Sequence, residues 1–210
     1  MTKLAELIAR WDTDEGKPYK GSLIDWDAYQ SDADNIGCMC AQGQVLHLVA
    51  GWTPDRLHNV AQVEADAETA KLLNISRAHA VLLRTINDKT DGAPAVVLTD
   101  PGKVIGDQWS KLLDFWWHLD RMTKDQWDAA SAAASAAASD AARAAAGAAA
   151  GAAAGAAAGA AARAAAGASS EIQGAAVMQQ KGQPFFFLSA FGFASPDDIP
   201  ARPESYGVAS

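Results

Sequence analysis

The sequence predicts an all-α fold, in which a small helical globular body carries a long Ala/Gly-rich helical insertion, present as one long helix or as broken helices. Apolar residues recur at helical spacing through most of the first 122 residues. Residues 129–168 hold 29 alanines in 40 positions and lack Val, Ile, Leu, Phe, Trp and Tyr, so they cannot form a core. We therefore divide the chain into a helical body (1–122), an arm (123–170) and a C-terminal segment (171–210) that packs back on the body.

The first half of the body begins with an amphipathic helix over residues 3–12, whose apolar residues recur at i, i+3, i+4 and i+7. The segment from there to residue 37 is rich in Asp, Gly, Ser and Pro, and we expect a loop anchored by Trp26 and Tyr29. A further helix within residues 38–51 ends at Gly51, a typical C′ glycine.

The second half of the body continues with a helix that starts near Pro54, because proline is favoured at N1. Two more helices follow over residues 65–74 and 76–88. Glycine and proline interrupt residues 90–103, where Val96, Val97 and Leu98 predict an extended segment. Residues 107–122 return to a strong helical pattern with tryptophan and leucine facing inward.

The arm begins with the spacing of a capping box between Thr123 and Gln126, which predicts a helix from Lys124 without a stop before Gly167. Its tetrads repeat Gly or Ser followed by alanines, and each glycine costs about 0.8–1 kcal/mol relative to alanine. Close approach of another helix would offset that cost. The glycines expected at such a contact are Gly147, Gly151, Gly155 and Gly159.

The four-residue period turns the stripe of small residues by about 40° per tetrad around a straight helix. Three arrangements remain open: a partner that winds around the arm, an arm that breaks into pieces, or a helix whose faces are all alike. Residues 144–162 formally match a transmembrane dimerisation pattern, but Ala and Gly contribute little to insertion, so we expect no membrane span. The composition also resembles type I antifreeze proteins, although no threonine follows Thr123.

Residues 67–86, "AETAKLLNISRAHAVLLRTI", resemble the helix-turn-helix of phage repressors and bacterial regulators. That resemblance implies that Arg77, His79 and Arg84 face DNA from the second helix. The alternative is a pair of core helices in which Ser76 caps the second. The formal net charge of −8 favours this alternative, because affinity for nucleic acid rests mainly on neutralising phosphates.

The sequence offers few candidates for a metal, catalytic or cofactor site. Cys38, Cys40 and His47 are candidate metal ligands, but a one-residue gap between cysteines is poor for zinc, and buried apolar thiols are the alternative. Common catalytic and phosphate-binding motifs are absent, so we expect neither an enzyme nor a cofactor. Five phenylalanines between 185 and 193 are expected to cover the Trp-rich helix at 109–119, or else to form a small-molecule pocket. The N-terminus has no apolar signal region, which predicts a cytoplasmic protein.

The WDAA-type tetrads, together with "CMCAQGQ" and "EIQGAAVMQQKGQPFFF", resemble alanine-rich proteins of actinobacteria and their bacteriophages. Here alanine and regular glycine replace much of the Asp and Trp of such tetrads, which indicates repeat expansion or deliberate simplification. The resemblance implies an origin more than an activity. We expect a non-enzymatic structural or interaction protein that meets a protein partner, such as a second copy, through the arm. A helix-turn-helix regulator and a small-molecule or ice-binding module are the alternatives.

Overall fold

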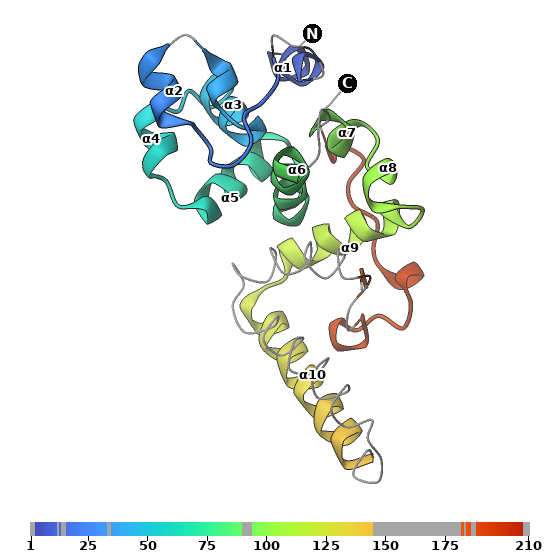
Figure 1. The fold of residues 1–210 in the computed structure, drawn as a ribbon. Coiled ribbons are helices and arrows are strands. Elements are labelled where there is room, and N and C mark those ends of the chain that lie inside the picture. The colour runs from blue at the N-terminus through green and yellow to red at the C-terminus, as the bar shows by residue number, and fades with distance from the viewer. Residues whose placement is uncertain are drawn as a thin grey trace. The chain divides into compact units, whose positions relative to one another are not determined.

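The computed structural model describes residues 3–11, 13, 16–32, 35–89, 94–144, 182, 184–185 and 188–207. The regular elements in this part of the chain are helices, which confirms the all-α class (Figure 1). The α-helices are α1 (Lys3–Arg10), α2 (Trp26–Ser31), α3 (Ala41–Leu48), α4 (Pro54–Asn59), α5 (Gln62–Leu72), α6 (Arg77–Lys89), α7 (Pro94–Thr99), α8 (Gly102–Ile105), α9 (Trp109–Arg121) and α10 (Lys124–Ala144). The 3-10 helices are η1 (Ile36–Cys38), η2 (Leu188–Phe191) and η3 (Pro196–Asp198).

The chain divides into two compact units. Unit 1 comprises Met1–Ser110 and Arg202–Ser210, and unit 2 comprises Lys111–Ala201. The division therefore falls inside α9. The sequence-based divisions at 122 and 170 stay predictions.

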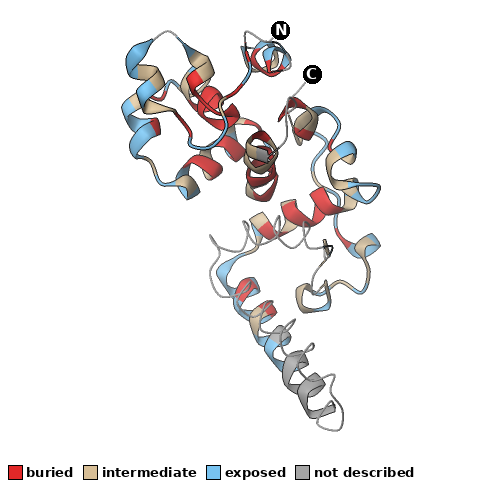
Figure 2. Cartoon of the chain, viewed as in Figure 1, coloured by how far each residue is buried: buried red, intermediate tan, exposed pale blue. Residues whose placement is uncertain are grey.

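Helix α3 is the centre of unit 1, where it packs against α1, α4, α5 and α6. Its first six residues, Ala41–Leu46, are all buried (Figure 2). Gly43 permits this burial, because a Cβ there would lie 2.1 Å from the backbone oxygen of Leu23. The helix ends at Leu48, before the predicted end at Gly51; Gly51 follows it with φ +69°, and its N–H donates to the His47 carbonyl at 3.1 Å.

A buried polar network joins α3, α5 and α6 around Asp66, which is 3% exposed. The Asp66 carboxylate accepts hydrogen bonds from the amides of Gln42 and Gln62, each at 3.0 Å. Arg84 adds an ion pair, with Nε 3.4 Å from the same carboxylate. Gln42 also donates to the Ala80 carbonyl at 3.0 Å. These charge-assisted bonds supply the partners that a buried carboxylate and buried amides require. We call these residues the Asp66 network.

The C-terminal residues return to the turn between α5 and α6. Asn74 occupies that turn with φ +50°, and its carbonyl accepts the Gly207 N–H at 2.9 Å. The Tyr206 hydroxyl lies 2.8 Å from Nδ1 of His79 and 3.3 Å from the N–H of Ser76. Residues 130 positions apart in the sequence therefore share one cluster of hydrogen bonds, which ties the end of the chain into unit 1.

Two expectations for the body were wrong. Residues Val96–Leu98 lie in helix α7 rather than in an extended segment. Pro94 is the first residue of this helix, where the fixed φ of proline is favourable. The hydroxyl of Thr99 donates to the Ala95 carbonyl in the last turn. The predicted loop before residue 38 contains α2 and η1. Helix α2 is one and a half turns long and capped by Asp25, so it is too short to produce a periodic pattern.

Unit 2 contains most of α9, all of α10 and the short helices η2 and η3. The buried residues of this part of α9 form a continuous stretch from Leu112 to Trp116, followed by Leu119. A search of the described residues of both units found no helix with the length and hydropathy needed to cross a membrane.

We predict that Asp66→Ala lowers the free energy of unfolding of unit 1 by about 2–4 kcal/mol, because it removes the carboxylate that pairs with Arg84 and accepts one hydrogen bond each from Gln42 and Gln62. Native-state hydrogen exchange of the α3 amides measures this quantity within unit 1. Glu64→Ala is the matched control on the same helix. Its ion pair with Arg56 is more than half exposed, so we expect a change below about 1 kcal/mol. Equal effects of the two substitutions would contradict the role of the network.

Candidate functional site

Helix α10 begins at the residue that the sequence predicts. The Thr123 N–H donates to Oε1 of Gln126 at 2.8 Å, and the Gln126 N–H donates to Oγ1 of Thr123 at 3.3 Å. This reciprocal pair is a capping box, and it satisfies two backbone donors that the helix start would otherwise leave unpaired. Lys124 and Asp128 add an i,i+4 ion pair on the first turn. The start of α10 is therefore set by local sequence alone.

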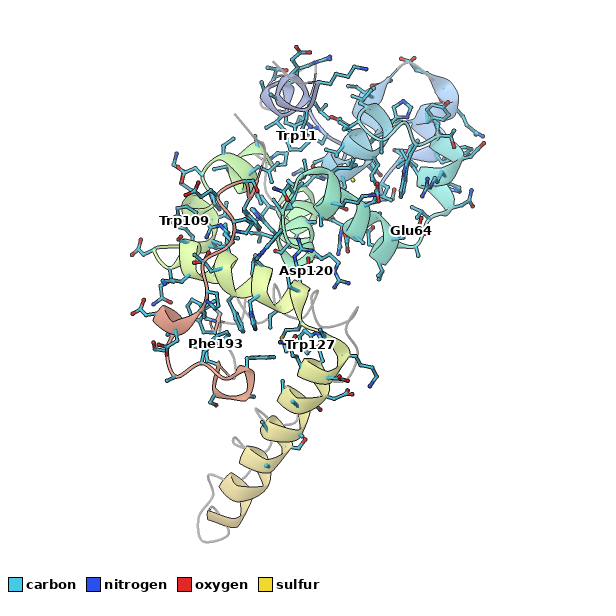
Figure 3. All side chains as sticks on the ribbon, turned by 180° about the vertical axis from the view of Figure 1, so that it is seen from behind. Trp11, Glu64, Trp109, Asp120, Trp127 and Phe193 are labelled. Atoms are coloured by element: carbon cyan, nitrogen blue, oxygen red, sulfur yellow. The ribbon has the colours of Figure 1, made fainter. Side chains whose placement is uncertain are left out.

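The first two turns of α10 are anchored by burial. Trp127 is 8% exposed and Ala130 is 3% exposed. The Trp127 ring meets the ring of Phe191 edge to face, with centroids 5.8 Å apart and an interplanar angle of 86°. Figure 3 shows Trp127 at the base of the helix. Aromatic pairs in this geometry contribute roughly 0.5–1.5 kcal/mol beyond the area they bury.

The C-terminal phenylalanines complete this anchor on α9. Phe115 is fully buried, and its ring centroid lies 5.6 Å from that of Phe191 and 6.1 Å from that of Phe185. Phe193 meets the half-buried ring of His118 edge to face at 4.9 Å. Burial lowers the pKa of His118 below its ordinary value. The sequence predicts this contact between the phenylalanines and the Trp-rich helix. We call Phe115, Trp127, Phe185, Phe191 and Phe193 the aromatic base.

Beyond the aromatic base, the described surface of α10 carries only small side chains. Ser131 is half-buried, and the exposed positions that follow are Ala132, Ala133, Ser135 and Ala136. Alanine has the highest intrinsic helix propensity, so this stretch favours helix without side-chain packing. Such a surface presents no titratable group and no large apolar group. It can act as a spacer, or as a contact that lets another helix approach closely.

The helix-packing glycines Gly147, Gly151, Gly155 and Gly159 lie outside the described residues. The choice among a winding partner, a broken arm and a uniform helix therefore stays open. What the structure adds is the first 21 residues of the arm, Lys124–Ala144, as one α-helix.

The helix-turn-helix candidates occupy different surroundings from those expected for DNA contact. His79 is 2% exposed, and its Nε2 lies 2.7 Å from the Val97 carbonyl. A carbonyl only accepts, so Nε2 carries the proton and Nδ1 accepts from the Tyr206 hydroxyl. Arg84 belongs to the Asp66 network, and Arg77 is half-buried. The structure thus places His79 in the core of unit 1, where it is not presented to a ligand outside the protein.

The turn that precedes His79 matches the alternative reading of two core helices. Oγ of Ser76 accepts the His79 N–H at 3.2 Å, the bond expected of an N-cap. Ser76 itself is fully buried, and the return of Tyr206 covers it.

The candidate metal ligands do not form a ligand cluster. Cys38 and Cys40 are buried free thiols, and Nδ1 of His47 lies 2.7 Å from the Trp52 carbonyl. Burial raises the pKa of Cys40 to about 12 and also raises that of Cys38, which disfavours the thiolates that bind metals. The Cys40 sulfur accepts the Gly43 N–H at 3.4 Å, as the N-cap of α3. Across the described residues, no group of three or more His, Cys, Asp or Glu side chains is placed to hold a metal ion.

Comparisons of this chain with protein-family models, with curated proteins and with solved structures found no match. The resemblance to alanine-rich tetrad-repeat proteins of actinobacteria and their bacteriophages therefore stays a prediction.

We predict that Phe191→Ala loosens the aromatic base, because it removes a ring that contacts both Phe115 and Trp127. The Phe193 N–H donates to the Leu188 carbonyl at 3.0 Å within the same segment, and hydrogen exchange of this amide measures the local opening. We expect its protection to fall roughly tenfold, which corresponds to about 1.4 kcal/mol. Ser189→Ala, at an exposed position of η2, is the control and should leave the protection unchanged. Unchanged protection in Phe191→Ala would contradict the anchor.

We also predict a pH dependence that arises from His79. Burial lowers its pKa from an ordinary value of 6.5 to about 4. Below pH 6.5 the unfolded chain binds a proton that the folded chain does not, so the stabilising contribution of neutral His79 is fully present above pH 6.5 and is lost as the pH falls towards 4. The loss in unit 1 is on the order of 3 kcal/mol. His79→Gln should flatten this dependence, and an NMR titration of the ring near pH 6.5 would contradict it.

Proposed function

We propose that this protein is a non-enzymatic structural or interaction protein that self-associates through α10 and the tetrads that continue it. One observation carries the proposal: past its anchored first turns, the described surface of α10 exposes only alanine and serine. Exposed alanine gains little from burial within its own chain, but it sets no steric limit on the approach of a second helix. The absence of large side chains suits close packing of backbone against backbone.

The charge pattern supports a second copy as the partner. Residues 129–144 carry Asp140 and Arg143 and no other charged residue, so two copies of this stretch do not repel one another. The two opposite charges stand three positions apart in the sequence, which allows complementary pairing between antiparallel copies. An origin in actinobacteria or their phages belongs to the same proposal and rests on the sequence resemblance alone.

Sedimentation velocity on the full chain tests self-association, and we predict an oligomer. Adding like charges to the exposed surface of α10 by Ala132→Glu with Ala136→Glu should shift the chain to monomer, because the charges would be buried without partners at the contact. Ala9→Glu with Gln30→Glu is the matched control: it adds the same charge at exposed helical positions of unit 1 and should leave the oligomer intact. Circular dichroism checks that all variants keep their helix content.

A deletion variant shows whether association requires the arm or the remainder of the protein. Deletion of residues 129–168 should give a folded monomer if the arm is the association element. A full chain that sediments as a monomer would contradict the proposal, as would an oligomer that survives both the double substitution in α10 and the deletion.

A further inference from the structure

Unit 1 contains a cavity of about 490 Å³ that is remote in sequence from the arm. Its walls come from residues within 19–27, from α4, from Val60 in the link after α4, and from Gln62 at the start of α5. Leu23, Ile24 and Leu57 supply an apolar lining, and each is at most 5% exposed. Cavities of this size and mixed lining are typical of sites for small organic ligands. The apolar lining favours a ligand with a hydrocarbon portion.

The charged groups of the lining are of one sign. Asp25 and Asp27 contribute carboxylates, and among the described residues no lysine or arginine lines the cavity. Asp25 is partly engaged, because its carboxylate accepts the Ala28 N–H as the N-cap of α2. Asp27 is exposed, and no hydrogen bond or ion pair of its carboxylate is recorded within the described structure. A low-dielectric wall beside two carboxylates concentrates cations.

Gln62 lines the cavity, and the orientation of its side-chain amide is fixed. Its Nε2 donates to Oε1 of Gln42 and to the Asp66 carboxylate, each at 3.0 Å. Both partners are acceptors, so the amide nitrogen must face the Asp66 network. The carbonyl oxygen is consequently held on the other side of the amide group. The buried network therefore fixes the orientation of this side chain in the cavity wall.

An aromatic wall completes the chemistry of the cavity. The Trp26 ring stacks on the ring of His58 with centroids 4.6 Å apart and an interplanar angle of 28°. Tyr29 supports Trp26 from its own helix at 5.6 Å. The stacking covers one face of the Trp26 ring and restricts the motion of this wall of the cavity.

We propose that this cavity binds an organic cation with an apolar stem, namely an alkylguanidinium or alkylammonium group. The stem packs on Leu23, Ile24 and Leu57, while the charged head meets the carboxylate of Asp27. The same chemistry is offered by a free small amine and by an arginine or lysine side chain of a peptide. This site is independent of self-association through α10.

The first arm of the test titrates the full chain with butylguanidinium and with its uncharged near-isostere, butylurea. NMR resonances of the Trp26 indole N–H and of the Gln62 amide report binding at the cavity itself. We expect saturable shifts for butylguanidinium with a dissociation constant of roughly millimolar size, as a ligand of so few atoms allows. Butylurea should bind at least roughly threefold more weakly, because it lacks the charge.

The variant Asp27→Asn tests the charge at an exposed position where folding is not at risk. It should weaken butylguanidinium binding roughly three- to tenfold. Asp55→Asn is the matched control, because Asp55 is likewise exposed and occupies the same second position of a six-residue helix, outside the cavity. Its affinity should equal that of the unchanged chain.

The second arm distinguishes the two sources of the cation. Acetyl-Ala-Arg-Ala-amide is compared with the same peptide in which uncharged citrulline replaces arginine. Tighter binding of the arginine peptide than of butylguanidinium assigns the site to a protein side chain, and weaker binding assigns it to a free amine. The proposal is overturned if no cation shifts the reporter resonances, if butylurea binds as well as butylguanidinium, or if Asp27→Asn leaves the affinity unchanged.

Discussion

Helix α3 is buried on nearly every face, and the polar side chains it carries must therefore find partners inside the protein. Gln42 meets this constraint by bonding to Asp66 and Ala80, and Gln44 by accepting from the Trp11 indole at 3.0 Å. These bonds connect α3 to α5, to α6 and to Trp11, which directly follows α1, so the arrangement of unit 1 depends on them. Apolar packing alone would allow α3 to rotate or slide, whereas unpaired buried amides would cost about 1–3 kcal/mol each.

Residues 202–207 meet the same constraint at the turn between α5 and α6, where buried polar groups also need hydrogen-bond partners. A short helix-to-helix turn exposes polar backbone groups, and here Tyr206 and Gly207 supply partners for them. The cover also removes water from His79, which is why its ring is neutral and fixed in one tautomer. The turn between α5 and α6 therefore has a structural role, because its polar groups already form hydrogen bonds with residues 206 and 207.

Much of the helical architecture is visible in the sequence, because local signals determine it. Thr123 and Gln126 define the start of α10, and Gly51 follows the end of α3, through backbone geometry that needs no distant partner. The contact of the C-terminal phenylalanines with α9 was also predictable from the amount of apolar surface on each. Helix α2 and the cavity beside it were not, because six residues carry too little periodicity and the cavity walls come from three separate segments. Asp66 was missed for a related reason: a lone aspartate in a helical pattern reads as a solvated residue until its partners are known.

The two candidate sites differ in how their geometry is specified. Gln62, which lines the cavity, is held by the Asp66 network, so the position of its side chain derives from the most constrained part of unit 1. Helix α10 depends on the aromatic base for its first two turns and on alanine propensity for the next, so the described side chains of that next stretch fix no partner orientation. A pre-organised pocket favours selectivity for one chemistry, whereas a uniform small-residue helix favours close contact with little selectivity. Under the two proposals, the arm meets another copy of itself and the cavity selects its ligand by charge.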